Sequence, residues 1–310
     1  MFAALFLLGD PVDHSFSPEM QARALAWAGI RGAYVPIRVG ARDVRSAVDA
    51  LGRLGFVGGN VTVPHKERAL ALVDDATARA RAIGAVNVLA RARARRRGSG
   101  GSGRGRGGAR EGFRGDNTDG EGFLDALRER AGIRPRGRRV LLFGGGGAAR
   151  AVLHAMLEAG AREVLVLNRT PARARALARA SRAWGARARV AHGPLDLARA
   201  LARDAARERF DLVVNATSVG LRGERAALVP EALVARAGAV ADLAYGARET
   251  RLARDARARG VPIVDGLDVL VGQGRLAFER WFGVTPPWGV LDREVRAAWR
   301  RRLGARGERG

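Results

Sequence analysis

The feature that constrains the fold most is an apolar run that ends in four glycines and leads into a helical pattern. Val140–Phe143 is wholly apolar, and a helix is expected over Ala148–Ala159. Between them stand Gly144, Gly145, Gly146 and Gly147. Glycines at such a turn let a pyrophosphate approach the backbone at a helix N-terminus. Ordinary strand–helix turns also use glycine, but this context predicts a dinucleotide site, and the absence of a following Gly-Lys-Ser/Thr argues against a triphosphate P-loop.

Short apolar runs alternate with helical stretches through the rest of the second half. Runs of this kind are typical of strands buried on both faces of a parallel sheet. They are Arg139–Phe143, Glu163–Leu167, Asp211–Val214, Ala239–Leu243 and Val261–Val264, with a helix such as Pro171–Ala183 between two of them.

The first third of the chain alternates in the same way. Strands are expected at Ala3–Leu8, Ala33–Val39, Gly59–Val63 and Val86–Ala90, and helices at Pro18–Ala28, Ala41–Leu54 and Lys66–Val73. Ser17, placed before Pro18, is the expected N-cap of the first helix. The pattern predicts the α/β class, with two open-sheet domains.

Two segments depart from this alternation. Arg91–Arg110 combines arginine with glycine and serine and cannot bury apolar surface, so we expect an enlarged mobile hairpin loop before a strand at Gly112–Asp116. We place the hinge between the domains near Asp119, where a helix starts. The last thirty or so residues are expected to be helical, with a frayed basic tail over Arg296–Gly310.

Composition excludes several classes of protein. Hydrophobic residues make up 47% of the 310 residues, which excludes a disordered chain. Cys is absent, which excludes disulfides, thiol nucleophiles and Cys-held metals. The apolar run Phe2–Leu8 is too short to span a membrane and no basic segment precedes it, so we expect a soluble cytoplasmic protein. The four histidines are dispersed, which disfavours a zinc site.

The net charge of +24 raises nucleic-acid binding as an alternative function. The basic residues are nearly all arginines scattered through alanine-rich helices, and aromatic residues make up only 5%. No basic–aromatic stacking pattern is present. We therefore expect at most weak, nonspecific polyanion contact through residues 91–110.

Lys66 is the only lysine in the chain. Lysine is a compact charge whose pKa can be tuned, whereas arginine stays protonated, so a lysine retained among arginines indicates a site that a guanidinium cannot serve. Chance survival is the alternative. Lys66 also opens a helix, where the dipole disfavours a purely structural cation.

Further polar side chains follow strand ends in the first third: Ser15 and Ser17, Asn60 and Thr62, Asn87, and Asp116–Asp119. Thr118 and Glu121 match a capping box, which gives Thr118 a structural alternative. Asp119 is not needed for that box and can pair with Lys66.

Two strand ends in the second half carry candidate cofactor contacts. After Leu167 the chain has Asn168, Arg169 and Thr170 at the place where an NAD site carries a carboxylate. We therefore favour a role for Arg169 in binding the 2′-phosphate of NADP over the alternative, a surface arginine beside a helix cap. Asn215 and Thr217 follow the next strand and are either cofactor contacts or members of a polar turn.

Together these segments resemble one family. GDPVDHSFSP, GNVTVPHK, GAVN, GDNTDG, FGGGGAAR, NRT, NATSVG and DGLDVLVGQG are similar to segments of shikimate dehydrogenases, in the family's order. The resemblance implies a substrate domain over residues 1–118, an NADP-binding Rossmann domain over 119–265, and C-terminal helices over 266–310 that return to the first domain. It implies reversible reduction of 3-dehydroshikimate to shikimate, on the way to chorismate and aromatic amino acids.

The resemblance also implies roles for individual residues. Lys66 and Asp119 are the catalytic pair, and Ser15 and Ser17, helped by Tyr245, bind the substrate carboxylate. The ring hydroxyls are held by Thr62, Asn87, Asp119 and Gln273. Cofactor contacts come from Gly144, Gly145, Gly146, Gly147, Ala148, Asn168, Arg169, Thr170, Asn215, Thr217 and Gly266; no metal is implied.

The chain departs from the family at Met20–Gln21, His65, Val88 and Val269. Val269 replaces a methionine expected near the nicotinamide, but none of these changes removes a catalytic group. Use of quinate stays open as an alternative, and so does the choice between monomer and homodimer.

Overall fold

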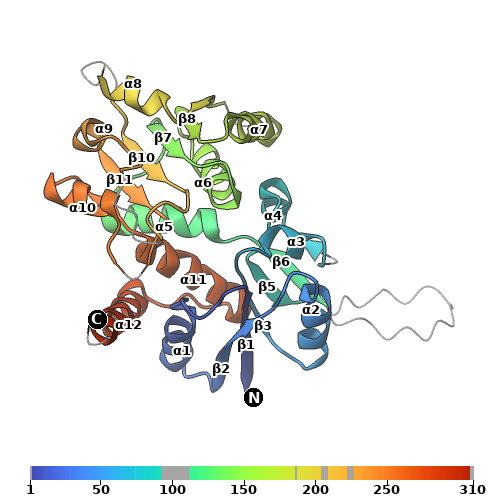
Figure 1. The fold of residues 1–310 in the computed structure, drawn as a ribbon. Helices are drawn as coiled ribbons and strands as arrows, with labels where there is room; N and C mark the ends of the chain where they lie inside the picture. The colour runs from blue at the N-terminus through green and yellow to red at the C-terminus, as the bar shows by residue number, and fades with distance from the viewer. Residues whose placement is uncertain are drawn as a thin grey trace. The chain divides into compact units, whose positions relative to one another are not determined.

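The computed structural model describes residues 2–73, 75–92, 112–185, 187–203, 209–221, 227–246 and 248–307. They divide into two compact units, each built around its own six-stranded sheet (Figure 1). Unit 1 comprises Met1–Asn117 with Ala277–Val284, and unit 2 comprises Thr118–Leu276 with Thr285–Gly310. The predicted α/β class with two open sheets is confirmed.

The sheet of unit 1 has the strand order β2-β1-β3-β5-β6-β4. β1 runs parallel to β2 and β3, whereas β5 is antiparallel to β3 and β6. Alternate residues of β1, Phe6 and Leu8, pack in one buried cluster with Val48 and Leu51 of α2. The elements are β1 (Ala3–Gly9), α1 (Ser17–Trp27), β2 (Gly32–Arg38), α2 (Val44–Arg53), β3 (Gly58–Val61), α3 (Lys66–Leu70), β4 (Asp75–Ala76), α4 (Ala78–Ile83), β5 (Val88–Arg91) and β6 (Phe113–Asp116).

The hairpin predicted around the basic insertion is present. β5 and β6 pair antiparallel with Arg91 opposite Phe113, and the amide of Ala92 donates to Gly112. Arg91 therefore belongs to the strand and not to the insertion, because the ladder extends to that residue. The remainder of the expected mobile loop, from residue 93 to 110, lies outside the described residues.

The sheet of unit 2 is wholly parallel in the order β12-β11-β10-β7-β8-β9. The chain order reverses between β7 and β10, and ligands bind at the carboxyl edge of such a switch point. The elements are α5 (Asp119–Ala131), β7 (Arg139–Phe143), α6 (Gly147–Glu158), β8 (Glu163–Asn168), α7 (Pro171–Ser181), the 3-10 turn η1 (Arg182–Trp184), β9 (Arg189–Pro194), α8 (Leu197–Arg203), β10 (Leu212–Asn215), α9 (Glu231–Arg236), β11 (Ala239–Asp242), α10 (Arg251–Ala258), β12 (Ile263–Val264), α11 (Gly266–Phe282) and α12 (Trp288–Gly307).

Both faces of this sheet are covered by helices (Figure 1). Val140 and Leu142 of β7 join a buried cluster with α5, α6 and α7, while Leu141 and Phe143 join a second cluster with α8, α9 and α10. Because successive side chains of a strand point to opposite faces, a strand between two helical layers must be apolar at every position. This explains the continuous apolar runs in the sequence.

In the second half, one strand was not predicted and one expectation was wrong. β9, which reads Arg-Val-Ala-His-Gly-Pro, was not predicted, because it is an edge strand that is only partly buried and lacks an apolar run. The tail from Arg296 is not frayed at its start. Arg296 is one-quarter exposed and forms ion pairs with Asp265, Asp268 and Asp292, which hold that turn of α12 in place.

The C-terminal stretch contributes to both units. In unit 1, the indole of Trp281 donates to the carbonyl of Leu89 at 3.0 Å. In unit 2, the indole of Trp299 donates to Gly246 at 2.8 Å. The functional boundaries at 118 and 265 remain a prediction. None of the helices in the described part of the chain has the length and apolar character needed to cross a membrane.

Candidate active site

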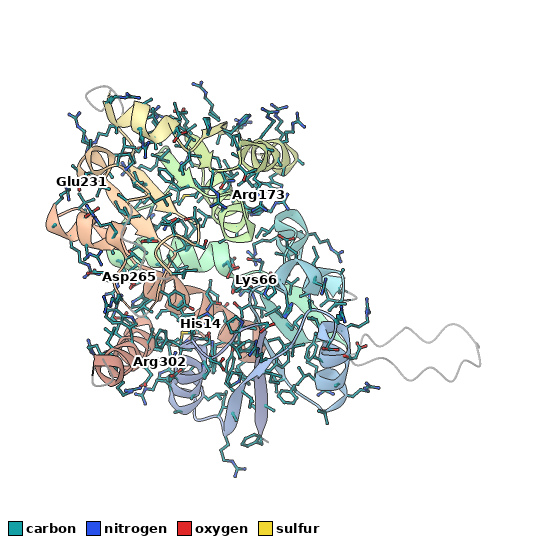
Figure 2. All side chains as sticks on the ribbon, viewed as in Figure 1. His14, Lys66, Arg173, Glu231, Asp265 and Arg302 are labelled. Carbon is teal, nitrogen blue, oxygen red and sulfur yellow. The ribbon has the colours of Figure 1, made fainter. Side chains whose placement is uncertain are left out.

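Lys66 is the first residue of α3, as expected, and its main chain is fixed on both sides (Figure 2). The buried ring of His65 lies 2.6 Å from the carbonyl of Val39 and donates to it in the tautomer protonated at Nε2. The carbonyl of Lys66 accepts from the amide of Val86 at 2.9 Å. The half-buried lysine therefore stands on an anchored turn, which limits where its amine can reach.

Asn60 lies in β3, shortly before this turn, and hydrogen bonds fix its side chain. Asn60 accepts from the Tyr34 hydroxyl at 2.8 Å and donates to the carbonyl of Asn87 at 3.0 Å. Asn87 precedes β5 and does not end a strand, contrary to expectation. Because β5 runs antiparallel to β3, its first residues still lie at the edge where β3 ends. Thr62 is half-buried two residues beyond Asn60.

Ser15 and Ser17 are both buried before and at the start of α1. The Ser15 hydroxyl accepts from the amide of Ser17 at 3.1 Å. The N-cap is Phe16, and Ser17 is the first helical residue, so the predicted cap at Ser17 is wrong. One hydroxyl thus orients the amide of the other serine, an arrangement suited to a carboxylate.

In unit 2, a close helix crossing brings together the first turn of α5 and the middle of α11. A Cβ on Gly122 would lie 2.2 Å from the amide of Gln273, and one on Gly272 would lie 2.1 Å from the carbonyl of Gly122. The hydroxyl of Thr118 donates to the carbonyl of Gln273 at 3.1 Å and makes no cap bond, so the capping box does not form. The crossing places Asp119 and Gln273 on adjacent turns of the two helices.

Tyr245 lies within electrostatic reach of Asp119. Burial raises the pKa of Tyr245 to about 12; Arg302 opposes this shift and the negative charge of Asp119 adds to it. Unit 2 therefore contains Asp119 together with Tyr245 and Gln273, both of which lie more than a hundred residues further along the sequence. Lys66, Ser15, Ser17, Thr62 and Asn87 belong to unit 1.

The glycine turn after β7 has the predicted open geometry. Gly144 has φ +136°, and a Cβ there would lie 2.7 Å from the carbonyl of Ala216. Nothing lies within 4 Å of a Cβ at Gly146 or Gly147, and Ala148 is exposed. The surface of the turn is therefore open where α6 begins, which fits the pyrophosphate of a dinucleotide at a helix N-terminus.

The end of β8 fits a 2′-phosphate. Arg169 is exposed and follows Asn168, whose amide nitrogen would lie 3.2 Å from a Cβ on Gly145. The Cβ of Arg173, a residue labelled in Figure 2, would lie 2.9 Å from the same Cβ. Asn168 donates to the carbonyl of Thr170 at 3.0 Å. Thr170 occupies the N-cap of α7 but its side chain makes no cap bond. The alternative role of Thr170 as a helix cap therefore lacks the hydrogen bond that a capping side chain accepts.

The turn after β10 favours the polar-turn alternative for Asn215. Its amide nitrogen donates to Val219 and Asp242, and its oxygen accepts from the amide and the hydroxyl of Thr217. These bonds use its full capacity. Cofactor contact by Asn215 and Thr217 stays a prediction, as does contact by Gly266, whose Cβ would lie 2.8 Å from the carbonyls of Leu243 and Ala244.

Sequence reasoning missed Asp242, which is 1% exposed at the end of β11. Burial raises its pKa to about 6 against the hydrogen bonds from Thr250, Ala244 and Asn215, and Asp265 raises it further. The available signal was a single carboxylate inside the apolar run Ala239–Leu243. Across the described ranges, no cluster of three or more histidine and acidic side chains is arranged to hold a metal ion.

Family models match most of the chain. The shikimate dehydrogenase substrate binding domain matches residues 7–89, the shikimate/quinate 5-dehydrogenase model 127–219, and the shikimate 5′-dehydrogenase C-terminal domain 266–295. The shikimate dehydrogenase (NADP(+)) of Rhodospirillum rubrum is 42% identical over 298 residues, covering 94% of this chain and 95% of its own. That of Acidiphilium cryptum is 41% identical and covers 90% of each chain.

Solved structures agree. Shikimate 5-dehydrogenase from Thermus thermophilus, in complex with NADP(H) and shikimate, superposes with a TM-score of 0.78 at 36% identity over 96% of this chain and 99% of its own. A ligand-free 5-ketofructose reductase of Gluconobacter reaches 0.79 at 28% identity over 96% and 99%. The fold therefore serves more than one substrate, but at the curated relatives' identity and coverage the chain belongs to the shikimate dehydrogenase family.

Proposed function

We propose that Lys66 and Asp119 form the acid–base pair with which this enzyme interconverts 3-dehydroshikimate and shikimate, using NADP(H). The observation that carries the proposal is the placement of Lys66, the only lysine in an arginine-rich chain, on a turn anchored through His65 and its own carbonyl. Family membership supports the reaction.

The residues divide the work of reducing a carbonyl group. NADPH supplies the hydride when it is bound. The ammonium of Lys66 donates a proton to the carbonyl oxygen as negative charge develops there, and in the reverse direction the neutral amine accepts the hydroxyl proton. Asp119 balances the charge of Lys66 and accepts a hydrogen bond from a ring hydroxyl.

Binding groups hold the substrate in one orientation. Ser15 and Ser17, with Tyr245, bind the carboxylate, and Thr62, Asn87 and Gln273 hold the ring hydroxyls. The burial of Ser15, Ser17 and Asn87 supports this assignment, because side chains already confined inside the protein lose little further entropy on binding. The open amides of α6, Arg169 and Thr170 hold the cofactor phosphates.

The test is Lys66→Arg, which keeps the charge but removes the tunable amine. We expect kcat to fall by at least about a hundredfold in both directions, with a smaller change in the KM for shikimate. Asp119→Asn should lower kcat in the same way. Arg53→Lys, the reverse exchange at an exposed position of α2, serves as the control and should leave kcat and KM unchanged. A near-normal kcat for Lys66→Arg would remove Lys66 from the chemistry.

Substrate range, location and assembly belong to the same proposal. Assaying quinate beside shikimate distinguishes a dual-specificity relative. We place the enzyme in the cytoplasm, where NADPH and the substrate are supplied, as a monomer or a homodimer. Polyanion contact through residues 91–110 is proposed as weak and nonspecific.

A further inference from the structure

Asp242 joins two loops at the carboxyl edge of the parallel sheet. It is the last residue of β11, opposite Asn215 at the end of β10. Its Oδ1 accepts from the amide nitrogen of Asn215 at 2.8 Å and from the main chain of Ala244 at 3.1 Å. Its Oδ2 accepts from the hydroxyl of Thr250 at 2.6 Å. The donors are the last residue of β10, where the next loop begins, and two residues of the loop after β11.

The first of these loops takes its shape through Asn215. The second hydrogen of the Asn215 amide goes to the carbonyl of Val219 at 3.0 Å, and the hydroxyl of Thr217 accepts from the amide of Val219 at 3.1 Å. Asp242 fixes which way the Asn215 amide points, because a carboxylate accepts only and must face the nitrogen. The turn over residues 215–219 is therefore set by a group on the neighbouring strand.

The two loops also lie in direct contact. A Cβ on Gly220 would approach the Thr250 methyl group to 2.9 Å, and one on Gly246 would approach the carbonyl of Leu221 to 2.6 Å. The amide of Leu243 donates to the carbonyl of Asn215 at 2.9 Å. These contacts join residues 215–221 to residues 243–246 and to Thr250 at the end of β10 and β11.

This edge is one half of the cofactor site. The β7–β9 half carries the glycine turn and Arg169, which fit the pyrophosphate and the 2′-phosphate of the adenosine half. In a doubly wound sheet the other three strands take the second mononucleotide, which here carries the nicotinamide.

We propose that Asp242 is a positioning residue that holds the two loops against the nicotinamide half of NADP(H), through Asn215 on one side and Thr250 on the other. It touches neither the substrate nor the reacting atoms. The proposal rests on the use of this edge by the cofactor and is independent of the roles of Lys66 and Asp119.

Burial of an ionised carboxylate among neutral donors supports the proposal. Among the described residues, no arginine or lysine forms an ion pair with Asp242, and the negative charge of Asp265, labelled in Figure 2, disfavours the ionised form of Asp242. A carboxylate in such surroundings destabilises the fold at neutral pH. A group retained under that condition is a candidate for function.

The test compares Asp242→Ala with Asp211→Ala in the full chain. Asp211 directly precedes β10 at the opposite edge, where it accepts from Arg138 at 3.0 Å and from the amide of Arg139 at 2.8 Å. We expect Asp242→Ala to raise the Kd of NADP⁺, measured by calorimetry, about tenfold, with a smaller change in the KM for shikimate. Asp211→Ala should lower the unfolding temperature and leave the Kd unchanged.

A second pair keeps the test decisive if Asp242→Ala does not fold. Thr250→Ala removes one of the bonds to Asp242, and Thr250→Ser restores the hydroxyl. A raised Kd in the alanine variant that the serine variant reverses supports the proposal. An unchanged Kd in folded Asp242→Ala, or in Thr250→Ala, overturns it. Loss of turnover in Lys66→Arg with normal NADP⁺ binding would concern the acid–base pair and not Asp242. Wild-type protein that does not bind NADP⁺ would contradict the cofactor assignment itself.

Discussion

Asp116 in unit 1 and Asp242 in unit 2 each end a strand and are each more than nine-tenths buried, yet their surroundings differ. Asp116 accepts from Arg280 at 2.8 Å, from Thr77 at 2.6 Å and from Arg79 at 3.3 Å. Within the part of the chain that the structure describes, Asp242 accepts only from neutral donors. Burial raises the pKa of both, but the hydrogen bonds and the two arginines bring the pKa of Asp116 below its usual value, whereas that of Asp242 is about 6.

The difference separates two uses of a buried carboxylate. A group with a lowered pKa contributes stability above pH 4 and loses it as the pH falls through its folded value. A group with a raised pKa opposes folding at neutral pH and stops doing so as the pH falls through 6 toward 4. Asp116 therefore raises the free energy of unfolding at neutral pH. Asp242, in our proposal, holds the loops after β10 and β11 and lowers that free energy.

The largest expected effect is that of Asp116→Asn. The substitution removes the charge of the carboxylate that both Arg79 and Arg280 contact, and breaking a buried ion pair costs about 3–5 kcal/mol. Urea denaturation at pH 7.5 measures this loss. The wild type should lose its advantage over the variant below pH 4, and equal stability of the two at pH 7.5 would contradict the stabilising role of Asp116.

Arg169→Ala tests a cation that, unlike Arg280, is exposed at its strand edge. Loss of one charge-assisted bond to the 2′-phosphate should raise the KM for NADPH by about ten- to a hundredfold, equivalent to about 1.5–3 kcal/mol. The KM for NADH should barely change, and the wild type should prefer NADPH. Arg175→Ala, at a nearby exposed position in α7, is the control and should leave both KM values unchanged. Equal losses with both cofactors would show that Arg169 acts on folding.

How much the sequence predicts also differs between the two units. The strands of unit 2 were predicted because each lies between two helical layers and must be apolar throughout, as Val140–Phe143 is. β9 was missed because an edge strand has no such requirement. In unit 1, Asn87 was expected to end a strand but precedes β5; because β5 is antiparallel to β3, the start of β5 lies where β3 ends.

Prediction of the site from the sequence is limited in the same way, because it depends on local residue patterns. Lys66 and the glycine turn were predicted because residue type and spacing alone indicate their chemistry. The Thr118 hydroxyl bonds to Gln273 and not to its own helix, and Arg296 holds three aspartates distant in sequence. Contacts of that kind depend on the packing of helices far apart in the chain. Motif reasoning does not contain this information.

Asp242→Asn should have a smaller effect on stability, of opposite sign to Asp116→Asn. Removing the buried charge relieves a cost of roughly 3 kcal/mol at pH 8 that follows from a pKa of about 6 against 3.8. Weaker hydrogen bonds to the neutral amide offset part of it, so we expect a net gain of about 1 kcal/mol. The gain should vanish near pH 4. A loss of stability at pH 8 would show that Asp242 stabilises the fold as Asp116 does.

The smallest effect is expected from deleting Gly98–Gly108 in the insertion between β5 and β6, the strand that ends in Asp116. None of the proposed site residues lies there, so kcat and both KM values should stay unchanged. Retention on heparin should fall, by an amount that shrinks as salt rises. A folded deletion protein without activity would show that the insertion supports the active strand ends.

The solitary lysine has a practical consequence. Apart from the α-amine, an acylating reagent finds one primary amine on the whole polypeptide, half-buried at the start of α3. Intact mass spectrometry can therefore show at most two amine additions, one on the α-amine and one on Lys66. An addition that increasing ligand concentration suppresses is assigned to Lys66, and its decrease then titrates occupancy of the proposed site.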